Sequence, residues 1–224
     1  MTFSVVARCA STGMFGVAVA SSSPAVAARC AYARAAVGAV ASQNVTDPRL
    51  GSRCLDLMAL GASAPEAIAV LKATGPHMEY RQVTAVDAAG RTAIHSGPNA
   101  LGVWAEAAAE NVACGGNLLA DARVPQAMVE AFAASDGPLG DRLIGVMRAA
   151  VAAGGEAGPI HSAGMKLVRE VSWPVADLRV DWTEECPVEA LAILWEIYKP
   201  QLEAYVTRAL DPAEAPGYGV PGDP

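Results

Sequence analysis

Thr2 carries a hydroxyl group and follows Met1 at the start of the chain. Aminopeptidases commonly remove an initiator methionine that precedes a small residue. The threonine would then have a hydroxyl nucleophile and a free α-amine on one residue. Such an amine titrates at about 7.7–8.0 in model peptides, so it can accept the hydroxyl proton near neutral pH. We therefore expect Thr2 to be the nucleophile of an amide-cleaving enzyme; the alternative is that it only begins an edge strand.

Three serines follow the second predicted strand, where the chain leaves the sheet before Pro24. This strand pairs with the first in the expected hairpin, so the serines should lie close to Thr2. We predict that Ser21 orients the amine of Thr2, and that Ser22 and Ser23 contact the substrate. Serines before a proline are also ordinary loop residues, and this alternative stays open.

Cleavage of an amide also needs donors for the oxyanion that develops on the carbonyl oxygen. Asn117 follows Gly115 and Gly116, and glycines allow backbone N–H groups to approach a ligand. We predict that the neutral amide of Asn117 donates to this oxyanion. The alternative is a turn from a strand into a helix, in which Asn117 satisfies its own backbone.

Five more polar side chains lie at predicted strand ends and loops. Asn44 and Asp47 follow the third strand, and we expect both to contact the substrate, although Asp47 is almost equally suited to cap the next helix. Glu156, His161 and Ser162 lie between a helix and a returning strand and are further candidates for substrate contacts. The histidines of the chain have no metal-ligand spacing, and no phosphate-binding or dinucleotide motif is present. We expect no metal and no cofactor.

The composition limits the class of protein and of partner. The chain has 224 residues, of which 53% are hydrophobic and 17% are charged, so it can bury a large core. The formal net charge is -7, which leaves no basic excess for phosphate contacts, so we expect no nucleic-acid partner. The partner that we expect is a small molecule with an amide-like group.

The cysteines and the longest uncharged stretch bear on the compartment. Five widely spaced cysteines without a Cys-x-x-Cys pair argue against a zinc cluster and a disulfide framework. Serine, threonine, glycine and proline interrupt the uncharged stretch 9–28, so we expect no membrane span and no membrane partner. No charged and then apolar leader opens the sequence, which favours a cytoplasmic protein. A cysteine nucleophile, Cys54 or Cys114, is a third hypothesis without an identifiable base.

The apolar pattern predicts strands and pairs of helices. Ser63 and Glu66 form a capping-box signature for one helix. Sheet segments at both ends, with helix pairs between them, indicate an α+β protein with two sheets packed face to face and covered by helices. The predicted strands are 3–8, 15–20, 37–42, 81–87, 92–95, 161–171 and 175–181, the predicted helices are 50–60, 64–72, 122–134, 138–153 and 187–210, and the stretch 25–36 stays ambiguous.

Four segments, 2–8, 16–21, 38–44 and 116–120, resemble the bacterial family catalogued as domain of unknown function 1028. The resemblance covers most of residues 2–182. It implies the architecture of the N-terminal nucleophile (Ntn) hydrolases, a four-layer αββα sandwich, in which Thr2 would be the nucleophile. Many members of this family carry a lysine in the polar loop after the second strand, where this chain has Ser22 or Ser23. Arg29 is our candidate for a replacement cation.

Residues 183–224 are expected to form a separate helical extension with a tail rich in proline and glycine. Segments 198–200, 205–212 and 217–224 are similar to a peptidoglycan-binding-like segment that follows the domain in some family members. The aromatic residues Trp195, Tyr198, Tyr205 and Tyr218 suggest a surface for a partner or a second copy. The function that we expect is an amidohydrolase. The alternative is a non-catalytic binding or assembly protein that forms a homo-oligomer through this extension.

Overall fold

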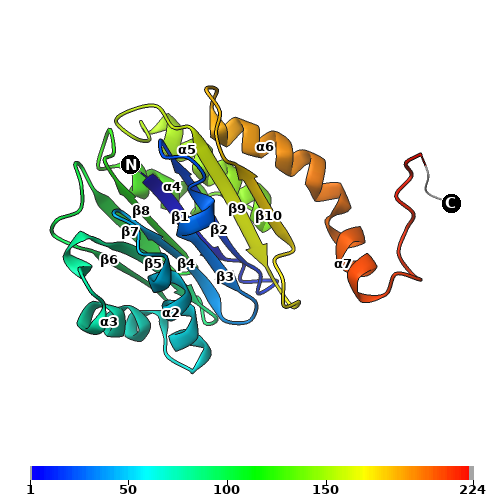
Figure 1. Ribbon diagram of the computed structural model, residues 1–224, viewed down its shortest axis with the longest axis horizontal. Helices are drawn as coiled ribbons and strands as arrows, with labels where there is room; N and C mark the ends of the chain where they lie inside the picture. Colours follow the sequence, from blue (N-terminus) through cyan, green and yellow to red (C-terminus); the bar gives the residue numbers. More distant parts are fainter. Residues whose placement is uncertain (1, 222–224) are drawn as a thin grey trace.

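Two antiparallel sheets lie face to face, and helices cover the outer face of each sheet (Figure 1). The computed structural model describes residues 2–221. Met1, whose removal the Thr2 mechanism requires, and residues 222–224 of the tail lie outside this range. The mixed α+β class expected from the sequence is confirmed.

The larger sheet has six strands in the order β10-β9-β2-β1-β8-β7. Its central strands consist of small and β-branched residues without a polar alternation, and they are buried on both faces. This burial follows because helices cover one face and the second sheet covers the other. The strands are β1 (Thr2–Arg8), β2 (Phe15–Ser21), β7 (Ala105–Ala109), β8 (Val112–Asn117), β9 (Ser162–Val168) and β10 (Ala176–Val180).

The smaller sheet has four strands in the order β3-β4-β5-β6. The ambiguous stretch 25–36 divides into the short helix α1 (Ala27–Cys30) and the edge strand β3 (Ala31–Arg34). The other strands are β4 (Gly38–Gln43), β5 (Gln82–Asp87) and β6 (Thr92–Ser96).

Each sheet has its own helices. The pair α2 (Pro48–Ala59) and α3 (Ala64–Thr74) packs on the smaller sheet, and a short 3-10 helix, Met78–Tyr80, follows it. The pair α4 (Val124–Ala133) and α5 (Leu139–Ala152) packs on the larger sheet together with α6 (Pro187–Tyr198). Both predicted helix pairs are therefore present.

Local side chains determine where α2 and α3 begin. The carboxylate of Asp47 accepts a hydrogen bond from the N–H group of Arg49 at 3.0 Å, which satisfies an unpaired donor in the first turn of α2. Ser63 Oγ accepts from the N–H of Glu66, and the Glu66 carboxylate accepts from the N–H of Ser63. The capping box predicted at α3 is confirmed.

The strands β7 and β8 were absent from the sequence-based prediction. The segment Val-Ala-Cys-Gly-Gly-Asn of β8 contains two glycines and has little local preference for a strand. Pairing with β1 on one side and β7 on the other makes it a central, fully buried strand. Tertiary pairing, rather than propensity, decides its structure.

The predicted helix 187–210 is interrupted. α6 ends at Tyr198, a 3-10 turn spans Lys199–Gln201, and α7 (Leu202–Leu210) follows (Figure 1). Pro200 causes the break, because proline has no backbone N–H and its ring clashes with the preceding turn. Trp195, which we expected on a partner surface, is only 3% exposed and packs in the core against Gly140 of α5.

The layer between the sheets changes character along the strands. At one end, which we call the apolar end, it is built from valine, alanine and phenylalanine side chains of both sheets. At the other end, where β1 begins, the same faces carry buried hydroxyl and amide side chains; we call this the polar end. The apolar end includes Val6, Phe15, Val17, Ala39, Val86, Ala113 and Val168. Val19 and Ala41 lie between the two ends, opposite Ser4 and Thr84.

Two further findings concern the whole described chain. Within residues 2–221, no helix has both the length and the apolar character needed to cross a bilayer. All five cysteines are free thiols, and four of them are buried.

Candidate functional site

Four polar residues form a row across neighbouring strands at the polar end. Thr2 of β1 lies opposite Asn117 of β8, and the β1–β2 register brings Thr2 opposite Ser21. Ser21 lies opposite Ser162 of β9. Residues directly opposite each other in a sheet share one face, and this face is the one that looks toward the smaller sheet. We call these four residues the polar row.

The members of the polar row are buried and in contact. Thr2 is 7% exposed, and the other three are at most 1% exposed. Thr2 Oγ1 lies 3.3 Å from Ser21 Oγ, so the two hydroxyl groups share a hydrogen bond. The structure therefore brings Asn117 and Ser162 to Thr2 and Ser21, whose proximity the hairpin pattern predicted.

Hydroxyl groups of the polar row also fix the backbone of the loop that follows β2. Ser21 Oγ accepts from the N–H of Ser23 at 3.0 Å. Ser162 Oγ donates to the carbonyl oxygen of Ser23 at 2.6 Å and accepts from the N–H of Val26 at 3.2 Å. Ser21, Ser23 and Ser162 thus have a structural part in this loop, whether or not they also contact a substrate.

Arg29 supports the same loop. Its guanidinium group donates to the carbonyl oxygens of Pro24 and Ala25 at 2.6 and 3.1 Å. Arg29 belongs to α1, and these contacts hold its positive guanidinium group beside the backbone of the loop. Its role as a replacement for the family lysine stays a prediction.

Glu156 binds the backbone of the same loop next to Ser21 of the polar row. Both of its carboxylate oxygens accept from the N–H of Ser22 at 3.2 Å. Its backbone forms an isolated β-bridge with Leu119, two residues after Asn117. The carboxylate also lines a cavity of about 300 Å³ together with Phe3 on the helix side of the larger sheet.

The protonation of Glu156 is unusual. The residue is 5% exposed, and its burial raises the pKa of the carboxyl group to about 7. Burial disfavours the charged form, while the hydrogen bonds from Ser22 favour it and limit the rise. Glu156 is consequently able to gain or lose a proton near neutral pH.

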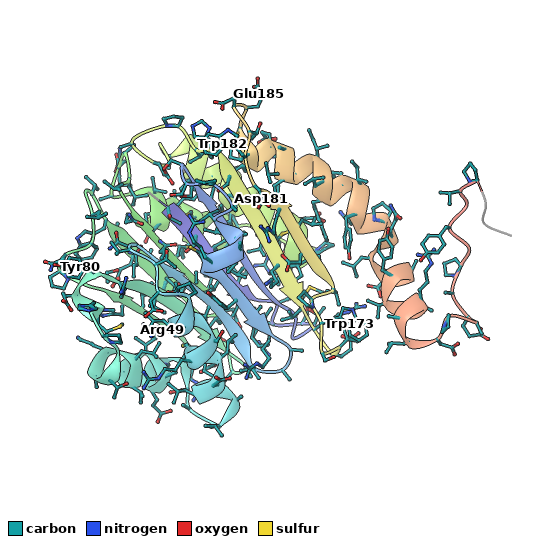
Figure 2. All side chains as sticks on the ribbon, viewed as in Figure 1. Arg49, Tyr80, Trp173, Asp181, Trp182 and Glu185 are labelled. Atoms are coloured by element: carbon teal, nitrogen blue, oxygen red, sulfur yellow. The ribbon has the colours of Figure 1, made fainter. Side chains whose placement is uncertain are left out.

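His161 is packed rather than solvated. Its backbone N–H donates to the carbonyl oxygen of Ser21 at 2.8 Å, and its ring Nδ1 donates to the carbonyl oxygen of Thr183 at 2.9 Å. The imidazole stacks on the indole of Trp182 at a centroid distance of 4.3 Å. Figure 2 shows Trp182 beside the end of the larger sheet where β1 begins, and Trp173 at the opposite end.

Asn44 and Asp47 use their side chains to hold neighbouring segments. Asn44 donates to the carbonyl oxygen of Tyr80 and accepts from the N–H of Leu101 at 3.1 Å. Asp47 binds the guanidinium and the backbone of Arg49 while it caps α2. Figure 2 shows Tyr80 and Arg49 on the side of the smaller sheet. Substrate contacts by Asn44 and Asp47 stay predictions, and both residues already have protein partners.

The glycines before Asn117 do not form the expected turn. Gly115 and Gly116 lie inside β8 and belong to its ladders with β1 and β7, so they are not available as oxyanion donors. The N–H groups of Leu118 and Leu119 donate to Leu101 and Val103. Of the groups predicted to donate to an oxyanion, only the side-chain amide of Asn117 stays a candidate.

The sequence-based prediction missed four buried polar residues between the sheets. Ser4, Gln43, Gln82 and Thr84 are at most 1% exposed. A methyl group at Gly115 would lie 3.2 Å from Thr84 Cγ2 and 3.3 Å from Gln82 Cδ, so β8 packs closely against β5, and an alanine here would fit only if these two side chains moved slightly. A signal was present at Ser4 and Thr84, since each lies between two apolar residues of a strand, whereas Gln43 and Gln82 lie at strand ends.

Other candidate chemistries find less support in the structure. Cys54 and Cys114 are fully buried, and burial raises the pKa of both thiols, which keeps them protonated. No group of three or more histidine, cysteine, aspartate or glutamate side chains in residues 2–221 is arranged to hold a metal ion.

Comparisons with known proteins give a family but no activity. The model of the Family of unknown function (DUF1028) matches residues 2–191. The crystal structure of protein SPO2555 from Silicibacter pomeroyi, which carries the same family model, is 28% identical with a TM-score of 0.82 and covers 88% of this chain and 89% of its own. Anbu (ancestral beta-subunit) from Yersinia bercovieri is 9% identical with a TM-score of 0.41, and the match covers 97% of this chain and 100% of its own. No curated protein matches the chain.

Proposed function

The chain belongs to the family of unknown function DUF1028, and we propose that it is an amidohydrolase whose nucleophile is Thr2 after removal of Met1. The observation that carries this proposal is the polar row, in which a buried threonine hydroxyl contacts Ser21 and lies opposite Asn117. We further propose that the stacked sheets and helices form the four-layer αββα sandwich of the N-terminal nucleophile hydrolases. The helices on both outer faces support this assignment.

In the first step, Thr2 Oγ1 attacks the carbonyl carbon of a small amide or a peptide-like bond. The α-amine of Thr2 accepts the hydroxyl proton, and a C–O bond forms while the carbonyl oxygen gains negative charge. The side-chain amide of Asn117 donates to this oxyanion. One positioned donor of this kind contributes about 10²–10³ in rate to acyl-transfer enzymes.

In the second step, the C–N bond breaks and the protonated α-amine gives its proton to the departing nitrogen. The acyl group stays on Thr2 as an ester. A water molecule then attacks the ester carbon, and its proton passes to the α-amine. The Thr2–acyl C–O bond breaks as the α-amine returns this proton to Thr2 Oγ1. The products are a carboxylic acid and an amine, and the Thr2 hydroxyl is restored.

The loop that follows β2 forms one wall of the proposed site. Ser21 orients the α-amine, while Ser22 and Ser23 present their side chains to the substrate from a backbone fixed by Glu156 and Ser162. Such a fixed backbone favours catalysis because the contacts need no reorganisation when the substrate binds. Glu156 and His161 complete the proposed binding residues on this side.

The test compares the processed protein with variants at Thr2. Intact-mass spectrometry should find Met1 absent, and a screen of small amides, ureido compounds and short peptides should find a hydrolysed compound. Thr2→Ala should lower that rate by at least about 10³-fold, as expected when a nucleophile is removed. Thr2→Ser keeps the hydroxyl and serves as the matched control. Retention of Met1 on an active protein would exclude this mechanism.

A second candidate function is supported by the outer surface of α6. Ile193 and Ile197 are 63% and 60% exposed on one side of this helix, although Trp195 on its other side is buried. We propose that this surface contacts a second copy of the chain in a homo-oligomer. Glutamate at both isoleucine positions should convert an oligomer into a monomer in light-scattering measurements, with the circular dichroism spectrum unchanged. An oligomer that withstands both glutamates would exclude this surface.

A further inference from the structure

Glu156 lies across the end of the larger sheet where β1 begins. Both of its carboxylate oxygens accept from the N–H of Ser22, in the loop after β2. Its backbone forms a β-bridge with Leu119, in the segment after β8. The strand order places β1 between β2 and β8. Glu156 therefore spans the end of β1, at which Thr2 is the first residue.

Backbone hydrogen bonds on both sides fix the position of Glu156. The N–H of Ala120 donates to the carbonyl oxygen of Gly155 at 3.1 Å. The N–H of Ala157 donates to the carbonyl oxygen of Leu118 at 3.0 Å. A carboxylate on such a fixed backbone can hold a reacting group in one orientation, as a positioning residue must.

The charge at the start of the chain acts on this carboxylate. Burial raises the pKa of Glu156 to about 7, and the positive charge of the N-terminus is the first of the influences that limit this rise. Removal of Met1 would place that charge on the α-amine of Thr2. Because opposite charges each favour the ionised form of the other, the carboxylate would in turn raise the pKa of this amine.

The carboxylate and the hydroxyl group of Thr2 approach the start of β1 from different sides. Glu156 lines the cavity of about 300 Å³ together with Phe3, whose ring packs on the helix side of the larger sheet. Thr2 Oγ1 contacts Ser21 Oγ on the side of the smaller sheet. An amine that donates an N–H to Glu156 on the first side has its lone pair left for the proton of Oγ1 on the second.

We propose that Glu156 positions the α-amine of Thr2: its carboxylate accepts a hydrogen bond from the amine and directs the lone pair toward Thr2 Oγ1. This inference rests on the proposed function and names the group that controls the pH response of its site. When the hydroxyl proton passes to the amine, the ammonium group that forms is paired with the carboxylate, which stabilises it. Glu156 itself takes up no proton in this step, so the proton balance of the reaction is unchanged.

Other titratable groups near Glu156 are less suited to this role. The charge of His161 acts on the carboxylate, but its ring Nδ1 is bound to the carbonyl oxygen of Thr183. The side chain of Glu184 is 78% exposed, so water and salt screen its charge. The titratable groups of the segment before α6 that line the cavity with Glu156 are Glu184, Glu185 and Cys186.

The test measures the pKa of the Thr2 amine in protein that begins at Thr2. A cleavable fusion that leaves Thr2 as the first residue supplies this protein whether or not cells remove Met1. NMR of protein with isotope-labelled threonine follows the titration, and the Thr2 signal is the one that Thr2→Ala lacks. Glu156→Gln should lower the pKa of the amine by about one pH unit, because it removes the opposite charge. Glu184→Gln, in the same cavity, is the matched control and should leave this pKa unchanged.

Two further measurements separate positioning from a structural role. In the unchanged protein, the Thr2 signal should respond to pH twice, once for the amine and once near pH 7 for Glu156. With a hydrolysed compound in hand, Glu156→Gln should move the acidic limb of the kcat/KM profile to lower pH by the same amount as the pKa of the amine. A purely structural role would lower the rate at every pH without moving the profile.

Three outcomes would overturn the role of Glu156. One is an amine pKa that Glu156→Gln leaves unchanged in protein with normal thermal unfolding, and another is an equal fall in Glu184→Gln. The third needs no variant: a Thr2 signal of the unchanged protein without a response near pH 7. A lowered amine pKa without any hydrolysed compound would contradict only the proposed function. Hydrolysis that depends on Thr2, with an unchanged amine pKa, would contradict only the role of Glu156.

Discussion

The two ends of the layer between the sheets are built on the same strands but from different side chains. On β1, Val6 belongs to the apolar end, whereas Ser4 and Thr2, on the same face, belong to the polar end. On β5, Val86 and Thr84 differ in the same way. Burial is nearly complete at both ends, so solvent access does not explain the difference. One end stabilises the stacked sheets, and the other retains hydrogen-bonding groups at a cost in stability.

The two ends contribute differently to the stability of the fold. Buried apolar pairs between sheets stabilise the fold through the surface that they remove from water. Buried hydroxyls and amides without partners stabilise nothing by themselves, and native proteins contain few of them. Such groups gather beside Thr2, at the polar end.

The largest effect is expected at the apolar end. Phe15→Ala should lower the free energy of unfolding by about 3–5 kcal/mol, because it leaves a cavity where a ring that is 1% exposed now packs. Denaturant unfolding followed by circular dichroism measures this loss. Phe15→Leu keeps most of the volume and should lose clearly less. A loss below about 1 kcal/mol for the alanine variant would mean that this end does not stabilise the stacked sheets.

A pH-dependent effect is expected beside the polar end. The ordinary pKa of a glutamate is 4.5, and burial raises that of Glu156 to about 7. The folded state therefore binds this proton more tightly than the unfolded state. Its contribution is complete below pH 4.5 and is lost as the pH rises through about 7. The total loss is at most about 3 kcal/mol.

Glu156→Gln should remove this loss, because glutamine stays neutral and keeps the shape of the side chain. Urea unfolding at pH 5 and pH 8 measures the effect: the wild type should lose more stability between the two values than the variant. The same pH dependence in both proteins would show that another group is responsible.

A smaller effect is expected from the loop contacts of the polar row. Ser162→Ala removes the acceptor for Val26 N–H and the donor to the Ser23 carbonyl, so it should cost about 2 kcal/mol. Urea unfolding measures this value. Ser52→Ala, at an exposed position of α2, is the control and should change stability by less than about 0.5 kcal/mol. Equal effects of the two alanines would mean that Ser162 does not hold the loop.

The smallest effect is expected at Ser4 of the polar end. Ser4→Ala removes a buried hydroxyl that has no partner, so the free energy of unfolding should rise or change by less than about 1 kcal/mol. Val6→Ala is the matched variant one pleat away, and it should cost more because it removes buried apolar surface. If Ser4→Ala destabilised the protein more than Val6→Ala, the hydroxyl would have a structural partner and the contrast between the ends would fail.

The elements that depend on local chemistry can be predicted from the amino-acid sequence alone. The capping box at Ser63 and Glu66 and the apolar periodicity of the helix pairs predicted α2 to α5, and the hairpin pattern predicted β1 and β2. Propensity, capping and periodicity act over a few residues, so they can be read from one segment. The same reasoning identified Thr2, Ser21, Asn117 and Ser162 as candidates, and the hairpin pattern indicated that Ser21 lies close to Thr2.

The hairpin pattern predicted that Ser21 lies close to Thr2, but the approach of Asn117 and Ser162 depends on strand pairing across the whole chain. Thr2 lies opposite Asn117, more than a hundred residues away, because β8 pairs with β1. Neither β8, with its two glycines, nor the approach of Gln82 to Gly116 has a local signature. Strand pairing depends on which buried faces fit one another across the whole chain. The alternation along a single strand shows which residues share a face, but not which strand they will face.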